Sequence, residues 1–163
     1  MSPEVKWSLI ATITAAIIGG IFILIAKRIP EKQPEVGPEQ SHAEILRPKT
    51  GQVVGHSFVV EGAHENLPPK YHMWLATEMN GLLWPKEPEV RAADRRWSIK
   101  IVESGSPPGG FFTLVLFQVS AEGNKTIMKW IARGHRTGDW PGIDPNKMHD
   151  YSQLYVVRDL RLW

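Results

Sequence analysis

Two histidines and three aspartates near the carboxyl terminus are the residues of this chain best suited to bind a metal ion. A zinc site usually has two ligands at short helical or hairpin spacing, as in H-E-x-x-H. Here His135 and His149 are separated by a Pro/Gly-rich loop that carries Asp139, Asp144 and Asp150. These side chains meet at a cation only if the loop folds back. The sequence therefore predicts no metal site and no cofactor. A membrane-anchored metal-dependent hydrolase using His135, Asp139 and His149 is the second alternative for the function of the chain.

The serine-bearing segment 104–110 (SGSPPGG) has the composition of a loop between strands. It lacks the G-x-S-x-G pattern that exposes a nucleophilic serine, and its glycines lack the lysine and helix context of a phosphate-binding loop. The paired carboxylates Glu87 and Glu89 flank Pro88 and are expected to point into water. These patterns predict that the protein is not an enzyme.

Tryptophans are the more informative set, because six of the seven follow the first forty residues. The alternation around Trp97 and the helical spacing around Trp130 predict buried rings, and Trp74 is expected in a core strand. Two other tryptophans precede prolines in turns, where large rings serve as packed lids or exposed contact anchors. The candidate ligand-binding residues are these two with nearby basic side chains: Trp84, Arg91, Arg95, Trp140 and His135.

The overall charge does not favour a polyanionic partner. The chain has 19 basic and 17 acidic residues, a net charge of +2. Lys86, Arg91, Arg95 and Arg96 form a local basic cluster, expected to be a solvated rim or to face anionic headgroups. Because basic residues do not interleave with aromatics on a predicted sheet face, the sequence predicts no nucleic-acid partner. The absence of cysteine excludes disulfides, thiolate metal sites and cysteine nucleophiles.

An uncharged segment near the amino terminus is predicted to anchor the chain in a membrane. Residues 7–26 (WSLIATITAAIIGGIFILIA) carry no charge, and a helix of that length spans about 30 Å, the thickness of a bilayer core. A cleaved signal peptide would have a shorter apolar run and a small residue where Leu24 stands. The sequence predicts an uncleaved single-pass signal anchor over residues 1–28, located in the cell membrane with the lipid bilayer as partner.

The flanking charges suggest an orientation for this anchor. Lys27, Arg28 and Lys32 follow the apolar segment, whereas Lys6, opposed by Glu4, precedes it. Basic residues prefer the cytoplasmic side, so the count favours a cytoplasmic domain. A domain outside the cell is the alternative.

Small residues recur every four positions in the same segment. Such rows let helix backbones approach closely in lipid. They predict self-association, or pairing with a protein partner, through the membrane helix. The packing residues are Ala11, Ala15 and Gly19 in one row and Thr12, Ala16 and Gly20 in the next.

A proline-containing spacer and a strand-rich domain follow the anchor. Residues 29–44 (IPEKQPEVGPEQSHAE) show no apolar periodicity, which is typical of a semi-extended linker. Asn80-Gly81 is a hairpin turn signal, and Ser120 can cap a helix over 121–133 that ends at Gly134 in the left-handed conformation. The pattern predicts a mainly β fold, an antiparallel β-sandwich over residues 45–163 with one short helix before the last strand. Strands are expected at residues 52–61, 71–79, 82–84, 96–103, 111–120 and 154–163.

The opening strands of this domain combine a proline-glycine opening strand, a strand that ends in glycine and a strand with an expected buried tryptophan. The residues of this pattern are Ile45, Pro48, Gly51, Val53, Val60, Gly62 and Trp74. In this pattern the chain resembles the immunoglobulin-like and fibronectin-type-III-like modules of single-pass bacterial membrane proteins. The resemblance implies an immunoglobulin-like sandwich and a binding, spacing or assembly role. The chain lacks the cysteine pair of true immunoglobulin domains.

Together these features predict a membrane-anchored, non-enzymatic recognition or adaptor module. It would bind a protein or a small ligand through its β-sandwich loops and assemble with a membrane complex. The first alternative is an outward-facing module that binds carbohydrate or envelope polymer, with Trp84 and Trp140 as stacking platforms.

Overall fold

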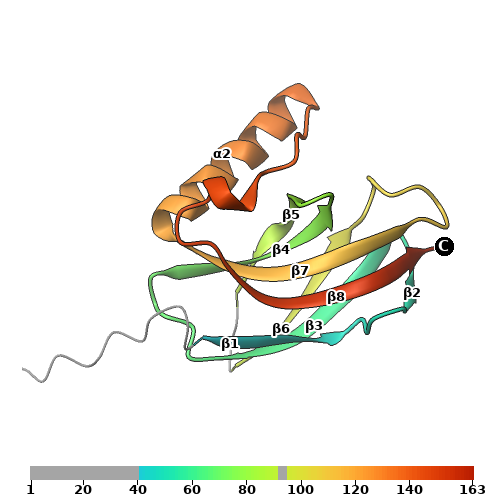
Figure 1. Cartoon of the computed structure of the whole chain (residues 1–163), viewed down its shortest axis with the longest axis horizontal. Coiled ribbons are helices and arrows are strands. Elements are labelled where there is room, and N and C mark those ends of the chain that lie inside the picture. The colour runs from blue at the N-terminus through green and yellow to red at the C-terminus, as the bar shows by residue number, and fades with distance from the viewer. Residues whose placement is uncertain (1–40, 92–94) are drawn as a thin grey trace, which may run out of the picture. The chain divides into compact units, whose positions relative to one another are not determined.

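The structure, a computed structural model, describes residues 41–91 and 95–163 (Figure 1). The predicted membrane anchor, its small-residue rows and most of the predicted linker lie outside these residues. In the two described ranges, no helix combines the length and the apolar character needed to cross a membrane. All described residues belong to one compact unit.

Two β-sheets and a helix before the last strand make up the described domain (Figure 1). The smaller sheet has three strands in the order β1-β3-β6, and the larger has five in the order β2-β8-β7-β4-β5. The expected mainly β domain with a helix before its last strand is confirmed. The strands are β1 (His42–Arg47), β2 (Val53–Val54), β3 (Ser57–Glu65), β4 (Tyr71–Met79), β5 (Leu82–Val90), β6 (Arg96–Val102), β7 (Phe111–Ser120) and β8 (Ser152–Leu162), and the helices are α2 (Ala121–Thr137) and the 3-10 helix η2 (Pro145–Lys147).

Strand boundaries agree with the sequence for some elements and differ for others. The predicted strand 82–84 continues to Val90, so Trp84 and Pro85 lie within β5 and the expectation of a turn there was wrong. The predicted strands 71–79 and 111–120 match β4 and β7 at both ends. The predicted strand 52–61 is divided, because β2 pairs in parallel with β8 whereas β3 pairs with β1 and β6 in the other sheet. β1 begins at His42, inside the segment predicted as linker.

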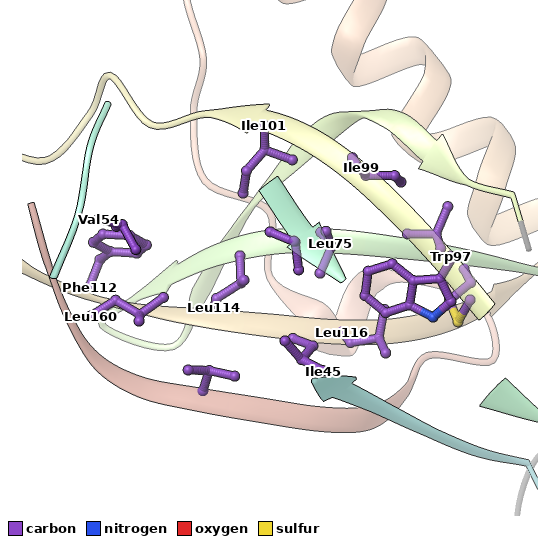
Figure 2. Close-up of a cluster of buried hydrophobic side chains, with 14 of the residues drawn as sticks. Ile45, Val54, Leu75, Trp97, Ile99, Ile101, Phe112, Leu114, Leu116 and Leu160 are labelled. Carbon is purple, nitrogen blue, oxygen red and sulfur yellow. The ribbon is translucent and has the colours of Figure 1, made fainter. Parts of the chain in front are cut away.

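The main hydrophobic core lies between the two sheets (Figure 2). β6 alternates buried and exposed residues, so Trp97, Ile99 and Ile101 face this core, as predicted. The Trp97 ring lies against Gly62 on the neighbouring β3, where any added Cβ would overlap the ring and the Glu44 carbonyl oxygen. Gly62 is therefore required by the packing of Trp97.

A second core lies between the larger sheet and α2. β7 is apolar on both faces because one face meets the other sheet and the other face lies under Ile127 and Ile131 of the helix. Trp74 is buried, as expected, but it belongs to this second core rather than to the space between the sheets. Its Nε1 donates to Asn124 Oδ1 of α2 at 2.9 Å.

The helix is one turn longer than predicted. Ser120 caps its start by accepting a hydrogen bond from the Gly123 N–H, as expected. Gly134 does not end the helix. The residue in the left-handed conformation is Gly138, with φ of 72°, whose N–H donates to the Gly134 carbonyl. Gly134 is instead buried against Trp140, and a Cβ there would overlap the indole ring.

Candidate functional site

A pocket of about 310 Å³ lies where the β4–β5 hairpin meets the segment after β6 and the segment around α2. Its volume is at the lower end of the range of about 300–1,000 Å³ usual for small-molecule sites. Aromatic rings form part of its wall, and an ion pair and hydroxyl groups line the rest. The lining residues are Thr77 and Met79 of β4, Trp84, Pro85 and Lys86 of β5, Glu103, Ser104 and Gly105 after β6, Trp130 of α2, and Trp140.

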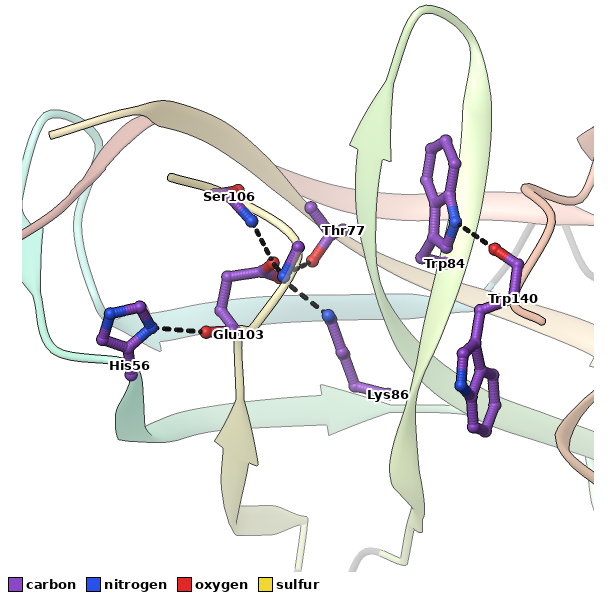
Figure 3. A network of polar contacts seen from close by, with 8 residues as sticks. His56, Thr77, Trp84, Lys86, Glu103, Ser106 and Trp140 are labelled. Atoms are coloured by element: carbon purple, nitrogen blue, oxygen red, sulfur yellow. Dashed lines mark hydrogen bonds and ion pairs between the residues drawn. The ribbon is translucent and has the colours of Figure 1, made fainter. Parts of the chain in front are cut away.

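The polar side of the pocket is built around the carboxylate of Glu103, which is 1% exposed (Figure 3). Lys86 Nζ lies 2.7 Å from Glu103 Oε2. The Thr77 hydroxyl donates to the same oxygen at 2.5 Å. The backbone N–H groups of Gly105 and Ser106 donate to Oε1 at 2.7 and 3.0 Å. Each carboxylate oxygen therefore accepts two interactions.

The environment of Glu103 keeps it ionised. Burial alone would raise the pKa of this carboxyl group. The hydrogen bonds from Lys86 and Thr77, the Lys86 charge and the Gly105 N–H oppose that effect, and the pKa of Glu103 lies below its ordinary value. The Glu103 backbone is fixed as well, since it exchanges hydrogen bonds with His56: its N–H donates to the His56 carbonyl at 2.8 Å, and its carbonyl lies 3.0 Å from His56 Nδ1.

The aromatic side of the pocket is held by two indole N–H groups that donate to consecutive carbonyls. Trp84 Nε1 donates to the Trp140 carbonyl at 2.8 Å, and Trp130 Nε1 donates to the Pro141 carbonyl at 2.6 Å. The Trp130 and Trp140 rings meet edge to face, with centroids 5.0 Å apart and an interplanar angle of 65°. Trp140 remains 37% exposed. The rings form a corner rather than a flat platform.

The loop after α2 is also anchored to the hairpin directly. Leu83 and Ile143 exchange two backbone hydrogen bonds, of 2.9 and 2.8 Å. A Cβ on Gly142 would lie 2.8 Å from the Trp84 ring, so the glycine allows the loop to pass close to the hairpin. These contacts place Trp140 beside Trp84, although 56 residues separate them in the sequence.

His135 and the acidic residues of β5 extend the site. His135 Nε2 lies 2.6 Å from Glu87 Oε2, and its ring meets the Trp140 ring edge to face at 5.2 Å. Glu89, on the other side of Pro88, lies 2.8 Å from His72 Nδ1. Glu87 is exposed, as expected, whereas Glu89 is half-buried, and each carboxylate has a histidine partner.

The structure brings some of the predicted ligand residues together and separates others. Trp84, Trp140 and His135 lie in one cluster. Arg91 and Arg95 are exposed and follow the end of β5, whereas Trp84 lies near the start of that strand. The predicted basic cluster is also divided, because Lys86 is only 14% exposed and is paired with Glu103.

Sequence reasoning missed Glu103, Thr77 and Trp130 as site residues. A signal for Glu103 was available, since it continues the odd-numbered inward series of β6 that begins at Trp97. An inward-facing carboxylate at the end of a buried series requires a partner. Trp130 was expected to be buried, but it is half-buried and lines the pocket.

The sequence predicts no metal site, and the hydrolase alternative would use His135, Asp139 and His149. His135 is paired with Glu87, and Asp139 lies 2.5 Å from Arg133. Among residues 41–91 and 95–163, no three His, Asp or Glu side chains are grouped closely enough to hold a metal ion.

Comparisons with protein-family models, with curated proteins and with solved structures give no match to this chain.

Proposed function

We propose that this chain is a membrane-anchored, non-enzymatic recognition module that binds its ligand in the tryptophan-lined pocket. The apolar segment 7–26 would anchor it, and the linker would carry the domain close to the bilayer. The observation that carries the proposal is an aromatic corner and a charge-balanced polar surface that line the same cavity. Occupancy of the pocket would be passed to a membrane partner through the small-residue helix rows.

The hydrogen bonding of the polar groups supports binding rather than catalysis. Both oxygens of Glu103 already accept two interactions each, so neither is placed to remove a proton from a ligand. The Lys86 ammonium is paired with that carboxylate, and an ammonium group has no lone pair with which to attack a ligand. These groups are suited to fixing the shape of the pocket.

The strand order supports an immunoglobulin-like classification of the domain. In such sandwiches one sheet contains strands A, B and E, and the other contains strands G, F and C, with C′ next to C in variable-type domains. The orders β1-β3-β6 and β8-β7-β4-β5 correspond to this arrangement. The helix between β7 and β8 is an addition to it.

The flanking charges favour a domain on the cytoplasmic side, and cysteine labelling tests this. Because the chain has no cysteine, Thr50→Cys in the exposed turn after β1 introduces a single reactive thiol. A membrane-impermeant maleimide is expected to label it only after cell lysis. Labelling in intact cells would place the domain outside and contradict the charge count. The cysteine-free parent chain is the control for background labelling.

Ligand recognition is tested on the full chain in phospholipid nanodiscs. The melting temperature is measured against a mixed library of sugars, amino acids, nucleosides, carboxylic acids and short peptides. A ligand of the pocket raises the melting temperature by mass action, and Trp140→Ala should abolish the shift. Trp163→Ala is the matched control, because that ring is 77% exposed and does not line the pocket. If no compound gives a Trp140-dependent shift, the proposed recognition site is wrong.

A further inference from the structure

We propose that the pocket binds a neutral saccharide, as a single ring or a chain end; this rests on the proposed function of the pocket as a ligand site. The aromatic corner, the polar part of the pocket lining and the charge balance each restrict the class of ligand.

The aromatic wall favours a ligand with an apolar face. The indole N–H groups of Trp84 and Trp130 are both used by the backbone of the loop that carries Trp140. The rings therefore present carbon faces and edges to the cavity. The C–H faces of a pyranose ring pack well on such surfaces, because burying them removes apolar area from water.

The polar part of the lining favours a ligand that carries several hydroxyl groups. Lys86 Nζ has three N–H donors, and its contact with Glu103 uses one of them. The exposed Ser104 hydroxyl lines the same wall and can donate or accept. A purely aliphatic ligand would desolvate these groups without replacing their hydrogen bonds with water, which is costly.

The charge balance favours a neutral ligand over either kind of ion. An aromatic pocket alone would suit a quaternary ammonium group, but the Lys86–Glu103 pair is neutral overall and gives a cation no unpaired counter-charge. An anion would be attracted to Lys86, but it would approach the buried Glu103 carboxylate that already neutralises that charge.

The shape of the pocket favours one ring over an extended polymer. Trp130 and Trp140 meet at 65°, so they enclose a corner instead of lying side by side along a surface. The volume of about 310 Å³ suits a ligand of small size. A polymer would therefore be recognised at its end.

The test uses the full chain in phospholipid nanodiscs, because glycoside detergents are themselves sugar ligands. Neutral mono- and disaccharides of glucose, galactose, mannose and N-acetylglucosamine are titrated, and binding is followed by tryptophan fluorescence and by saturation-transfer NMR. Tetramethylammonium, inorganic phosphate and a proline-rich decapeptide serve as probes of the other classes. The variants are Trp140→Ala, Ser104→Ala and the control Trp163→Ala, with far-UV circular dichroism to verify folding.

We expect at least one neutral sugar to bind, at least tenfold weakening in Trp140→Ala, weakening in Ser104→Ala, and no change in Trp163→Ala. If Trp140→Ala fails to fold, the sugar affinity of Ser104→Ala, a change on the exposed loop, decides whether the pocket is the binding site. Trp140-dependent binding of the ammonium, phosphate or peptide probe, with no sugar bound, overturns the saccharide assignment and leaves the recognition function standing. Binding of no probe also overturns the assignment, and the library experiment then decides the proposed function separately.

Discussion

The Lys86 ammonium on β5 lies 2.7 Å from the Glu103 carboxylate, which directly follows β6, so this ion pair joins the two sheets. Thr77 of β4 donates to the same carboxylate and adds a second link between the sheets. The ion pair links the edge strand β5 to the end of the edge strand β6, and both of its residues line the pocket. The stability of the two-sheet domain and the shape of the pocket therefore depend on the same few atoms.

Removing one partner of this pair should cost much more than removing both charges. Lys86→Met leaves the Glu103 carboxylate buried without a counter-charge, which we expect to lower the free energy of unfolding by about 3 kcal/mol. The double variant Lys86→Met/Glu103→Gln should recover part of that loss, because glutamine carries no charge. Urea denaturation of the full chain in nanodiscs, followed by tryptophan fluorescence, measures both.

Lys125→Met is the control for these two variants. Its ion pair with Glu122 is mostly exposed, so no measurable change is expected. Equal losses in the single and double variants would contradict the expectation that the unpaired Glu103 charge is what destabilises Lys86→Met.

Acid should weaken the domain through Glu103. The folded-state pKa of Glu103 lies below its ordinary value of 4.5, so its ionised form stabilises the fold. That contribution is fully present above the ordinary pKa and is lost as the pH falls through the lower folded-state value. The unfolding free energy of the parent chain should therefore fall more steeply below about pH 4.5 than that of Glu103→Gln. Parallel pH profiles would contradict the assignment.

Gly134→Ala should disturb the aromatic corner. Alanine in a helix interior normally stabilises by about 1 kcal/mol relative to glycine. Here its Cβ would overlap the Trp140 ring, which must move away from Trp130 and His135. We expect a weaker near-UV circular dichroism signal and no gain in stability. Arg136→Ala on the exposed helix face is the control, and a stabilised Gly134→Ala variant with an unchanged spectrum would refute the packing argument.

Gly62→Ala should be among the most damaging small changes in the domain. Its Cβ would overlap both the Trp97 ring and the Glu44 backbone oxygen, and β3 is fixed between β1 and β6. We expect a loss of about 3 kcal/mol in unfolding free energy, typical of severe overpacking. Val59→Ala, on the same strand but half exposed, should change stability by no more than about 0.5 kcal/mol. Similar small effects for both variants would contradict the packing argument.

Local patterns predicted most strands because the information lies within each segment. The alternation of Trp97, Ile99 and Ile101 fixes which face of β6 is buried, and the continuous apolar run of β7 indicates a central strand. The same patterns did not indicate which core a residue joins. The strand pattern around Trp74 predicts a buried ring, but only the position of α2 shows that the ring lies beneath the helix.

The site was harder to predict because it is assembled from distant segments. Trp84 and Trp140 were singled out by their turn prolines, yet their contact depends on the Leu83–Ile143 pairing. Lys86 was grouped with its basic sequence neighbours, whereas in the structure its partner is Glu103 from the other sheet. Pairing across sheets leaves no periodic signal in the sequence.

The outer edge of β5 has a consequence for how crowded copies behave. Ile143 occupies both backbone groups of Leu83, and Pro85, two residues further on, has no N–H to donate. An exposed strand edge with free donors can recruit a strand from another molecule and begin aggregation. If the domain is concentrated on a membrane surface, this blocked edge resists strand exchange between neighbours next to the pocket.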